Sequence, residues 1–229
     1  MIKLTPRLQA IANEIEPCNC FADVGCDHGY ISLYVLDRWK ANRVVAIDVS
    51  LKCLEKTIRL LKSANVDDQA IFYNCNGLSR VREKPDEVLI AGMGGDEIIK
   101  ILYDYSRVRP LNTIENLILQ PMKDIYAVRK WLNENGFAIV TDKVVKDKKL
   151  YHILRAKPAI QRLTEEQLMF GVVLQSYFCK EYLEWLREYE QKYIKILKTA
   201  NKQLAVTESV KFTLNRIRNQ IKLVEEEIC

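Results

Sequence analysis

The sequence predicts an α/β fold in which a parallel β-sheet, with helices on both faces, is followed by an α-helical coiled-coil hairpin. Up to Pro158, short apolar runs alternate with amphipathic stretches, which is typical of βαβ units. After Pro158 the apolar residues instead recur at helical spacing. We therefore expect a sheet domain over residues 1–158 and a helical coiled-coil domain over residues 159–229.

The strands of the expected sheet are short apolar runs at 20–24, 43–47, 70–73, 87–91 and 116–119. Between them lie helical patterns near 29–40, 51–65, 95–105 and 123–135. Two further strand patterns, 137–145 and 150–156, flank the polar stretch 146–149. This stretch predicts a turn, so the last two strands should form an antiparallel hairpin.

The helical part should begin at a capping box, because Thr164 is followed three residues later by Gln167. One helix then carries the apolar seam Phe178, Tyr182, Trp185, Tyr189, Tyr193 and Ile196. After a break near 201–208, a second helix carries the seam Val210, Leu214, Ile217, Ile221, Val224 and Ile228. Two such seams predict an antiparallel hairpin whose aromatic stripe is core. A row of lysines is either a phosphate-facing edge or an ordinary solvated face: Lys192, Lys195, Lys198 and Lys202.

The composition excludes several classes of protein. The 229 residues carry a net charge of +5, which is compatible with a nucleic-acid partner but is too small to indicate one alone. No apolar run is long enough to span a membrane, and no secretory signal is present, so we expect a cytoplasmic protein. The seven cysteines are scattered and only two histidines are present, which argues against a disulfide framework and a metal site.

A glycine-containing loop follows the first strand and opens a helix: Asp23, Val24, Gly25, Cys26, Asp27, His28, Gly29 and Tyr30. Dinucleotides require G-x-G-x-x-G, but Asp27 occupies the place of the second glycine, where a carboxylate would repel a pyrophosphate. A P-loop is excluded because no G-K-[ST] follows. S-adenosylmethionine carries no phosphate and has a positive sulfonium and amino group, which carboxylates at Asp23 and Asp27 would favour.

Polar residues also follow the next strands of the sheet. Asp48 ends the second strand, where an acid accepts hydrogen bonds from ribose hydroxyls. Asn76 follows the third strand and offers an acceptor to an adenine amino group, while Gly77 would let the ring lie flat. The fourth strand runs into Ala91-Gly92-Met93-Gly94-Gly95. This segment lacks the [D/N/S]-P-P-[Y/F/W] motif that holds an exocyclic amine, and its absence favours a ring nitrogen as the methyl acceptor.

Three segments together resemble the bacterial tRNA adenine-22 N1-methyltransferases: 23–30, Ile-Ala-Gly-Met-Gly-Gly at 90–95 and Leu-Ile-Leu-Gln-Pro at 117–121. The opening Leu4-Thr5-Pro6-Arg7-Leu8 also fits the family, and the resemblance covers essentially the whole chain. It implies a Rossmann-like class I methyltransferase sheet followed by a coiled-coil domain. The family usually carries Asp where this chain has Asn76, so that contact loses a charge here.

The resemblance implies S-adenosylmethionine as cofactor and tRNA as partner, with methylation at adenine N1. The expected cofactor-binding residues are Asp23, Gly25, Cys26, Asp27, Gly29, Asp48, Asn76, Gly77, Ala91 and Gly92. The expected catalytic residues are Asp27, which would stabilise the cationic methylated ring, Tyr30, which would stack on the adenine, and Met93. The expected substrate-binding residues are His28, Tyr30, Gly94, Gln120 and Pro121.

Other functions remain open at this point. The acceptor of the methyl group is alternatively another RNA, a small molecule or a protein. A module that binds the cofactor without catalysis, or a nicotinamide enzyme, would also fit the fold. We expect a monomer or a weak homodimer, without a metal or a membrane partner.

Overall fold

The computed structural model describes residues 2–172, 179–199 and 204–228 of the chain. A seven-stranded sheet in the order β3-β2-β1-β4-β5-β7-β6 forms its centre. The strands are β1 (Cys18–Val24), β2 (Ala41–Ile47), β3 (Ala70–Tyr73), β4 (Glu87–Met93), β5 (Asn116–Pro121), β6 (Phe137–Asp147) and β7 (Lys149–Pro158). The first five are parallel, and β7 is antiparallel to β5 and to β6, so the predicted sheet and its final hairpin are confirmed.

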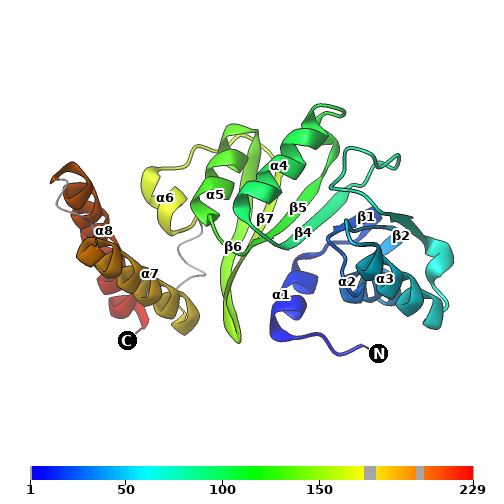
Figure 1. Cartoon of the computed structure of the whole chain (residues 1–229), viewed down its shortest axis with the longest axis horizontal. Coiled ribbons are helices and arrows are strands. Elements are labelled where there is room, and N and C mark those ends of the chain that lie inside the picture. Colours follow the sequence, from blue (N-terminus) through cyan, green and yellow to red (C-terminus); the bar gives the residue numbers. More distant parts are fainter. Residues whose placement is uncertain (1, 173–178, 200–203, 229) are drawn as a thin grey trace.

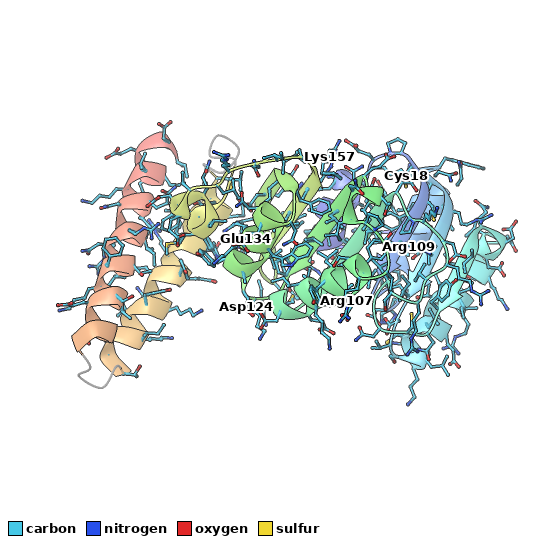
Figure 2. The ribbon with its side chains drawn as sticks, turned by 90° about the horizontal axis from the view of Figure 1, so that it is seen from above. Cys18, Arg107, Arg109, Asp124, Glu134 and Lys157 are labelled. Carbon is cyan, nitrogen blue, oxygen red and sulfur yellow. The ribbon has the colours of Figure 1, made fainter. Side chains whose placement is uncertain are left out.

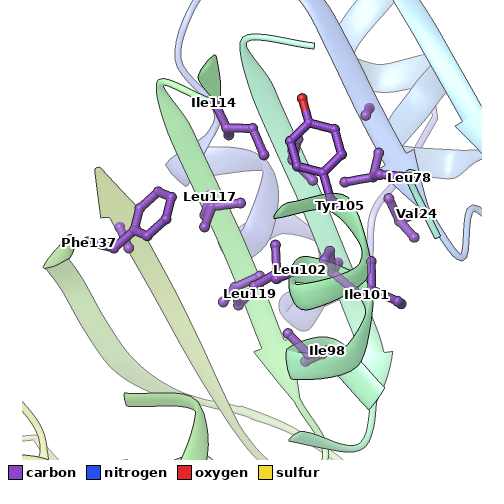
Figure 3. Packing of buried hydrophobic residues seen from close by; sticks show 14 of the residues in the cluster. Val24, Leu78, Ile98, Ile101, Leu102, Tyr105, Ile114, Leu117, Leu119 and Phe137 are labelled. Carbon is purple, nitrogen blue, oxygen red and sulfur yellow. The ribbon is translucent and has the colours of Figure 1, made fainter. Parts of the chain in front are cut away.

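Helices cover both faces of the sheet (Figure 1). Their bounds are α1 (Pro6–Glu14), α2 (Tyr30–Asp37), α3 (Leu51–Ser63), α4 (Gly95–Ser106) and α5 (Ile125–Glu134). On one face, Leu102 and Tyr105 of α4 pack with Leu117 and Leu119 of β5 (Figure 3). On the other face, the second core contains Ile11 of α1 together with buried residues of α2 and α3. Because the strands between these cores are buried on both sides, their sequences are continuous apolar runs.

The order of the strands reverses direction at β1, whose two neighbours are β2 and β4. In an open parallel sheet, the helices that follow two such strands lie on opposite faces and leave a crevice at the strands' carboxyl ends. The fold therefore provides a binding crevice directly above the loop after β1.

The C-terminal part forms the predicted helical hairpin, at the end of the molecule opposite to β2 and β3 (Figures 1 and 2). It consists of α7 (Lys180–Thr199) and α8 (Leu204–Ile228). The two helices are antiparallel, because Arg187 pairs with Glu225 and Glu190 with Arg218.

The aromatic stripe of α7 is core at Tyr182 and partly buried at Trp185, Tyr189 and Tyr193, whereas Ile196, expected on the same seam, is 36% exposed. Tyr182 is fully buried, and the rings of Tyr182, Trp185, Tyr189 and Tyr193 contact one another in sequence at 5.1–5.5 Å between centroids. Val144 of β6 belongs to the same cluster, so the hairpin packs on the sheet domain. Phe178 and Lys202 lie outside the described residues.

The structure corrects four sequence-based expectations. Helix α1 was not predicted; Thr5 caps it through a hydrogen bond to the Leu8 N–H. The helix capped by Thr164, α6 (Glu165–Phe170), does not continue into α7, because Gly171 at φ +118° ends it. The turn expected at 146–149 is shorter, since Asp147 pairs with Lys149 around Lys148 alone. The break expected at 201–208 is also shorter, because α8 begins at Leu204.

A buried charged cluster joins the sheet to the segment that leads into the hairpin. Arg129 of α5 donates two hydrogen bonds to Asp142 of β6, at 2.8 and 3.0 Å, and both side chains are fully buried. Arg129 also donates to the carbonyls of Leu168 and Met169 in α6. Burial raises the pKa of Asp142, but the Arg129 guanidinium and the His152 side chain outweigh it and lower that pKa to about 2. His152 in turn packs edge-on against Trp185 of α7.

No helix in the described residues is long and apolar enough to cross a bilayer. The domain boundary expected at Pro158 coincides with the end of β7. Leu163 and Val172, which lie beyond that point, still pack against the first core, so the boundary stays a prediction.

Replacing Arg129 with methionine should lower the free energy of unfolding by about 3–5 kcal/mol, because Asp142 would remain buried without its partner. The measurement is urea unfolding at pH 7, with Lys130→Met as the control. Lys130 is exposed and forms an exposed ion pair with Glu134 at 3.9 Å, so its loss should change stability by less than about 0.5 kcal/mol. Equal stability of the two variants would contradict a structural role for the cluster.

Acid should remove the same stabilisation in the wild type. Because the pKa of Asp142 lies below its ordinary value of 3.8, the contribution is present above about pH 4 and is lost as the pH falls toward 2.

Candidate functional site

A pocket of about 630 Å³ opens at the carboxyl ends of β1 and β4, where the sheet's strand order reverses. Nine of the residues expected at the site line it: Asp23, Gly25, Cys26, Asp27, His28, Tyr30, Ala91, Gly92 and Met93. Segments that are separate in the sequence therefore meet as predicted. The position of the pocket agrees with the crevice rule for parallel sheets.

The loop between β1 and α2 has an unusual backbone. Gly25, Asp27 and Gly29 have φ values of +77°, +46° and +72°, a region that glycine adopts freely and Asp tolerates. A side chain at Gly29 would place a Cβ 2.6 Å from Thr57 Cγ2 and 3.0 Å from Thr57 Cα. The glycine thus allows α3 to pack directly against the loop. This contact fixes the loop beneath the pocket.

Cys26 is buried in this loop and accepts a hydrogen bond from the Thr57 hydroxyl at 3.4 Å. Burial, followed by the nearby Asp23 carboxylate, raises the pKa of the Cys26 thiol to about 12. The thiol is therefore protonated at neutral pH and is a poor nucleophile.

Asp23 ends β1 with its carboxylate almost fully buried. The Ser32 hydroxyl of α2 donates to it at 2.7 Å, and no Lys, Arg or His among the described residues forms an ion pair with it. Burial raises the pKa of Asp23 to about 6; the hydrogen bonds from Ser32 lower it, and the neighbouring Asp48 charge raises it. A carboxylate that lines a pocket without a cation is suited to a cationic ligand.

Asp48 lies behind the loop and does not line the pocket. It accepts hydrogen bonds from the backbone N–H groups of Asp27 at 3.0 Å and Ser50 at 2.8 Å. A carboxylate has about four acceptor sites, so these two bonds leave capacity for a ligand hydroxyl. The apolar residues that follow, Val49 and Leu51, are 67% and 55% exposed. An acid beside exposed apolar side chains fits a ribose and an attached flat base.

Four expected cofactor contacts do not line the pocket: Gly29 and Asp48, described above, and Asn76 and Gly77. Asn76 is exposed, and Gly77 is buried at φ +67° with Ile101 only 3.0 Å from where its Cβ would lie. Asn74, rather than Asn76, reaches the end of β2, by donating to the Asp48 carbonyl at 2.9 Å. The cofactor roles of Asn76 and Gly77 stay predictions.

Three expected substrate contacts also lie outside the pocket. Gln120 is fully buried and accepts a hydrogen bond from Arg7 Nη1 at 2.8 Å. Pro121 borders a neighbouring hollow, which lies between the sheet and α7. Gly94 caps the start of α4, where a Cβ would lie 3.1 Å from Lys123 Cε. Their direct contact with a substrate stays a prediction.

The mouth of the pocket combines charge with a flat aromatic surface. Asp27 is 59% exposed, and its carboxylate lies 3.7 Å from His28 and 3.8 Å from Lys56. The rings of His28 and Tyr30 are stacked, with 5.4 Å between centroids and 9° between planes. This arrangement offers a planar ligand a stacking surface next to a carboxylate.

Sequence reasoning missed the opposite wall of the pocket. Arg7 and Leu8 of α1 line it together with Met122 and with Asp147, Lys148 and Tyr151 of the β6–β7 hairpin. The signal for α1 was the pair Thr5-Pro6, a capping residue followed by a residue favoured in the first helical turn. No sequence signal places the hairpin tip here, because its contact with α1 joins segments about 140 residues apart.

Within the described part of the chain, no group of three or more metal-ligating side chains is present. The pocket itself combines an acidic wall at Asp23 and Asp27, an aromatic stack at its mouth and the half-buried Arg7.

Comparison with protein families gives a match between residues 4–154 and the methyltransferase domain family. Among curated proteins, the Bacillus subtilis tRNA (adenine(22)-N(1))-methyltransferase is 26% identical over 236 residues, covering 99% of this chain and 98% of that protein.

Two solved structures share the fold over nearly the whole chain. TrmK of M. capricolum, in complex with S-adenosyl-homocysteine, has a TM-score of 0.85 at 23% identity, and the match covers 96% of this chain and 99% of that one. The B. subtilis m1A22 tRNA methyltransferase TrmK has a TM-score of 0.79 at 23% identity, with 100% of both chains covered. The resemblance in fold thus includes the helical hairpin as well as the sheet.

Proposed function

We propose, from the premise that this chain belongs to the methyltransferase domain family, that it methylates N1 of adenine 22 in tRNA with S-adenosylmethionine as cofactor. The observation that carries the proposal is the buried Asp23 carboxylate, which lines the pocket without a cationic partner among the described residues. The end-to-end similarity to the B. subtilis enzyme supports tRNA as the substrate and position 22 as the target.

The residues of the pocket fit the cofactor. S-adenosylmethionine supplies an electrophilic methyl group on a positively charged sulfur. Asp23 provides negative charge for its sulfonium and amino group, and Asp48 provides acceptors for its ribose hydroxyls. Gly25 lets the end of the Met93 side chain lie against the loop, since a Cβ there would lie 2.5 Å from Met93 Cε. Asn76 and Gly77 are proposed to border the adenine of the cofactor from the loop after β3.

For the methyl acceptor, the protein's contribution is alignment and charge. The N1 lone pair of an unpaired adenine needs no base to remove a proton, because N1 carries none. The His28–Tyr30 stack orients the ring, and the exposed Asp27 carboxylate stabilises the positive charge that the ring acquires. Met93 and the glycines around it leave room for the ring and offer no side-chain acceptor for an exocyclic amine. A tRNA substrate also implies a cytoplasmic enzyme.

The direct test is incubation of unmodified tRNA with the protein and labelled S-adenosylmethionine, followed by mass spectrometry of the nucleosides. We expect labelled 1-methyladenosine that maps to position 22. A transcript with guanine at that position is the control and should take up no label. Label on another base, or on metabolites and not on tRNA, would contradict the proposal.

Replacing Asp27 with asparagine should lower turnover about 10²- to 10³-fold while changing cofactor affinity less than about threefold. Asparagine removes the charge and tolerates the positive φ at this position, so the loop should keep its shape. Single-turnover kinetics and calorimetric titration of the cofactor give the two numbers, and Asp37→Asn, on the exposed far end of α2, is the matched control. A parallel loss of cofactor affinity would instead make Asp27 a cofactor-binding residue.

A further inference from the structure

Arg7 is the second residue of α1, and its guanidinium is held in place on two sides. Nη1 donates to the Gln120 side-chain oxygen at 2.8 Å. The Gln120 amide nitrogen donates to the Pro121 carbonyl, which fixes the orientation of the amide. On another side, the Arg7 guanidinium carbon lies 5.3 Å from the centroid of the Tyr151 ring. Such a fixed guanidinium loses little freedom when it binds a planar anion.

The helix that carries Arg7 is itself anchored. The backbone N–H of Arg7 donates to the Asp147 side chain at 3.3 Å, at the tip of the β6–β7 hairpin. The Asp147 carboxylate, which is also hydrogen-bonded to Thr5, is thereby engaged in holding α1. No carboxylate lies within 4.0 Å of the Arg7 guanidinium among the described residues. The pocket thus contains a half-buried cation with no carboxylate in direct contact, although its charge also helps to lower the pKa of the nearby Asp147 carboxylate.

The proposed cofactor carries an anionic group that a cation such as Arg7 can neutralise. The amino-acid end of S-adenosylmethionine carries an amino group and a carboxylate on the same carbon atom. A pocket that attracts the amino group with Asp23 would repel the neighbouring carboxylate, unless a cation lies close by. Gly92, near the end of β4, lies next to Arg7: a Cβ on Gly92 would lie 3.7 Å from Arg7 Nη1, an ordinary contact distance. Arg7 and Asp23 line the same pocket.

We propose that Arg7 binds the carboxylate of the cofactor's methionine moiety, so that α1 forms part of the cofactor site. This inference rests on the proposed function, because it takes S-adenosylmethionine as the ligand. It assigns complementary tasks to the two walls: Asp23 for the cationic groups and Arg7 for the anionic one.

The test compares S-adenosylmethionine with its decarboxylated analogue, which lacks only the carboxylate. In calorimetric titrations, Arg7→Met should weaken binding of S-adenosylmethionine about 10- to 100-fold and leave the analogue's affinity nearly unchanged. Arg7→Lys keeps the charge and should recover part of the loss. Lys62→Met is the matched control, because Lys62 is exposed at the far end of α3 and does not line the pocket.

Two outcomes would overturn the assignment. One is Arg7→Met binding S-adenosylmethionine like Lys62→Met, whether or not its affinity for tRNA falls. The other is an equal loss for both ligands, which would mean that the pocket is distorted. The proposed function fails separately, if the wild-type protein binds neither ligand.

Discussion

The rest of the site depends on a carboxylate that is buried at the carboxyl end of β1. Asp23 is placed there because β1 is covered on both faces, and removing its charge from water raises its pKa to about 6. Ser32 compensates part of this cost by donating a hydrogen bond from the first turn of α2. Gly25 and Gly29 have positive φ values, a backbone conformation that residues with an L side chain rarely adopt. Because Gly29 has no Cβ, α3 packs directly against the loop. These features hold a negative charge in the pocket, and a cationic ligand would supply the partner that this charge lacks.

The remainder of the molecule closes and supports this pocket. The β6–β7 hairpin turns around a single residue, Lys148, and its tip anchors α1 through Asp147. In this way the N-terminal helix and the last two strands form the wall opposite Asp23. The middle of the same hairpin carries Asp142 and His152, which connect to α5, to α6 and to Trp185 of α7. One pair of strands therefore links the pocket to the helical hairpin.

Much of the fold was predictable from the sequence, because burial on both faces leaves continuous apolar runs and helical seams repeat at regular spacing. The loop 23–30 was predictable for a similar reason: its glycines and acids follow a strand directly. Helix α1 was missed because it is short, and the split between α6 and α7 was missed because Gly171 is one residue within a helical pattern. The wall formed by Arg7 and Tyr151 has no local signal, since it depends on contacts between the two ends of the sheet domain. The expected contact of Gln120 with the substrate stays a prediction; in the structure its side-chain oxygen accepts a hydrogen bond from Arg7.

The most direct test of this account is the pH dependence of cofactor affinity. His28 lines the same pocket, and Asp48 and Cys26 lie close to Asp23, so the wild type is compared with Asp23→Asn. Because the cationic ligand binds the ionised carboxylate, wild-type affinity for S-adenosylmethionine should rise between pH 5 and 7, with its midpoint near the Asp23 pKa of about 6. Asp23→Asn should bind more weakly and lose most of this dependence. A wild-type profile that is flat over this range, or one that the variant reproduces, would contradict the central role of the buried carboxylate.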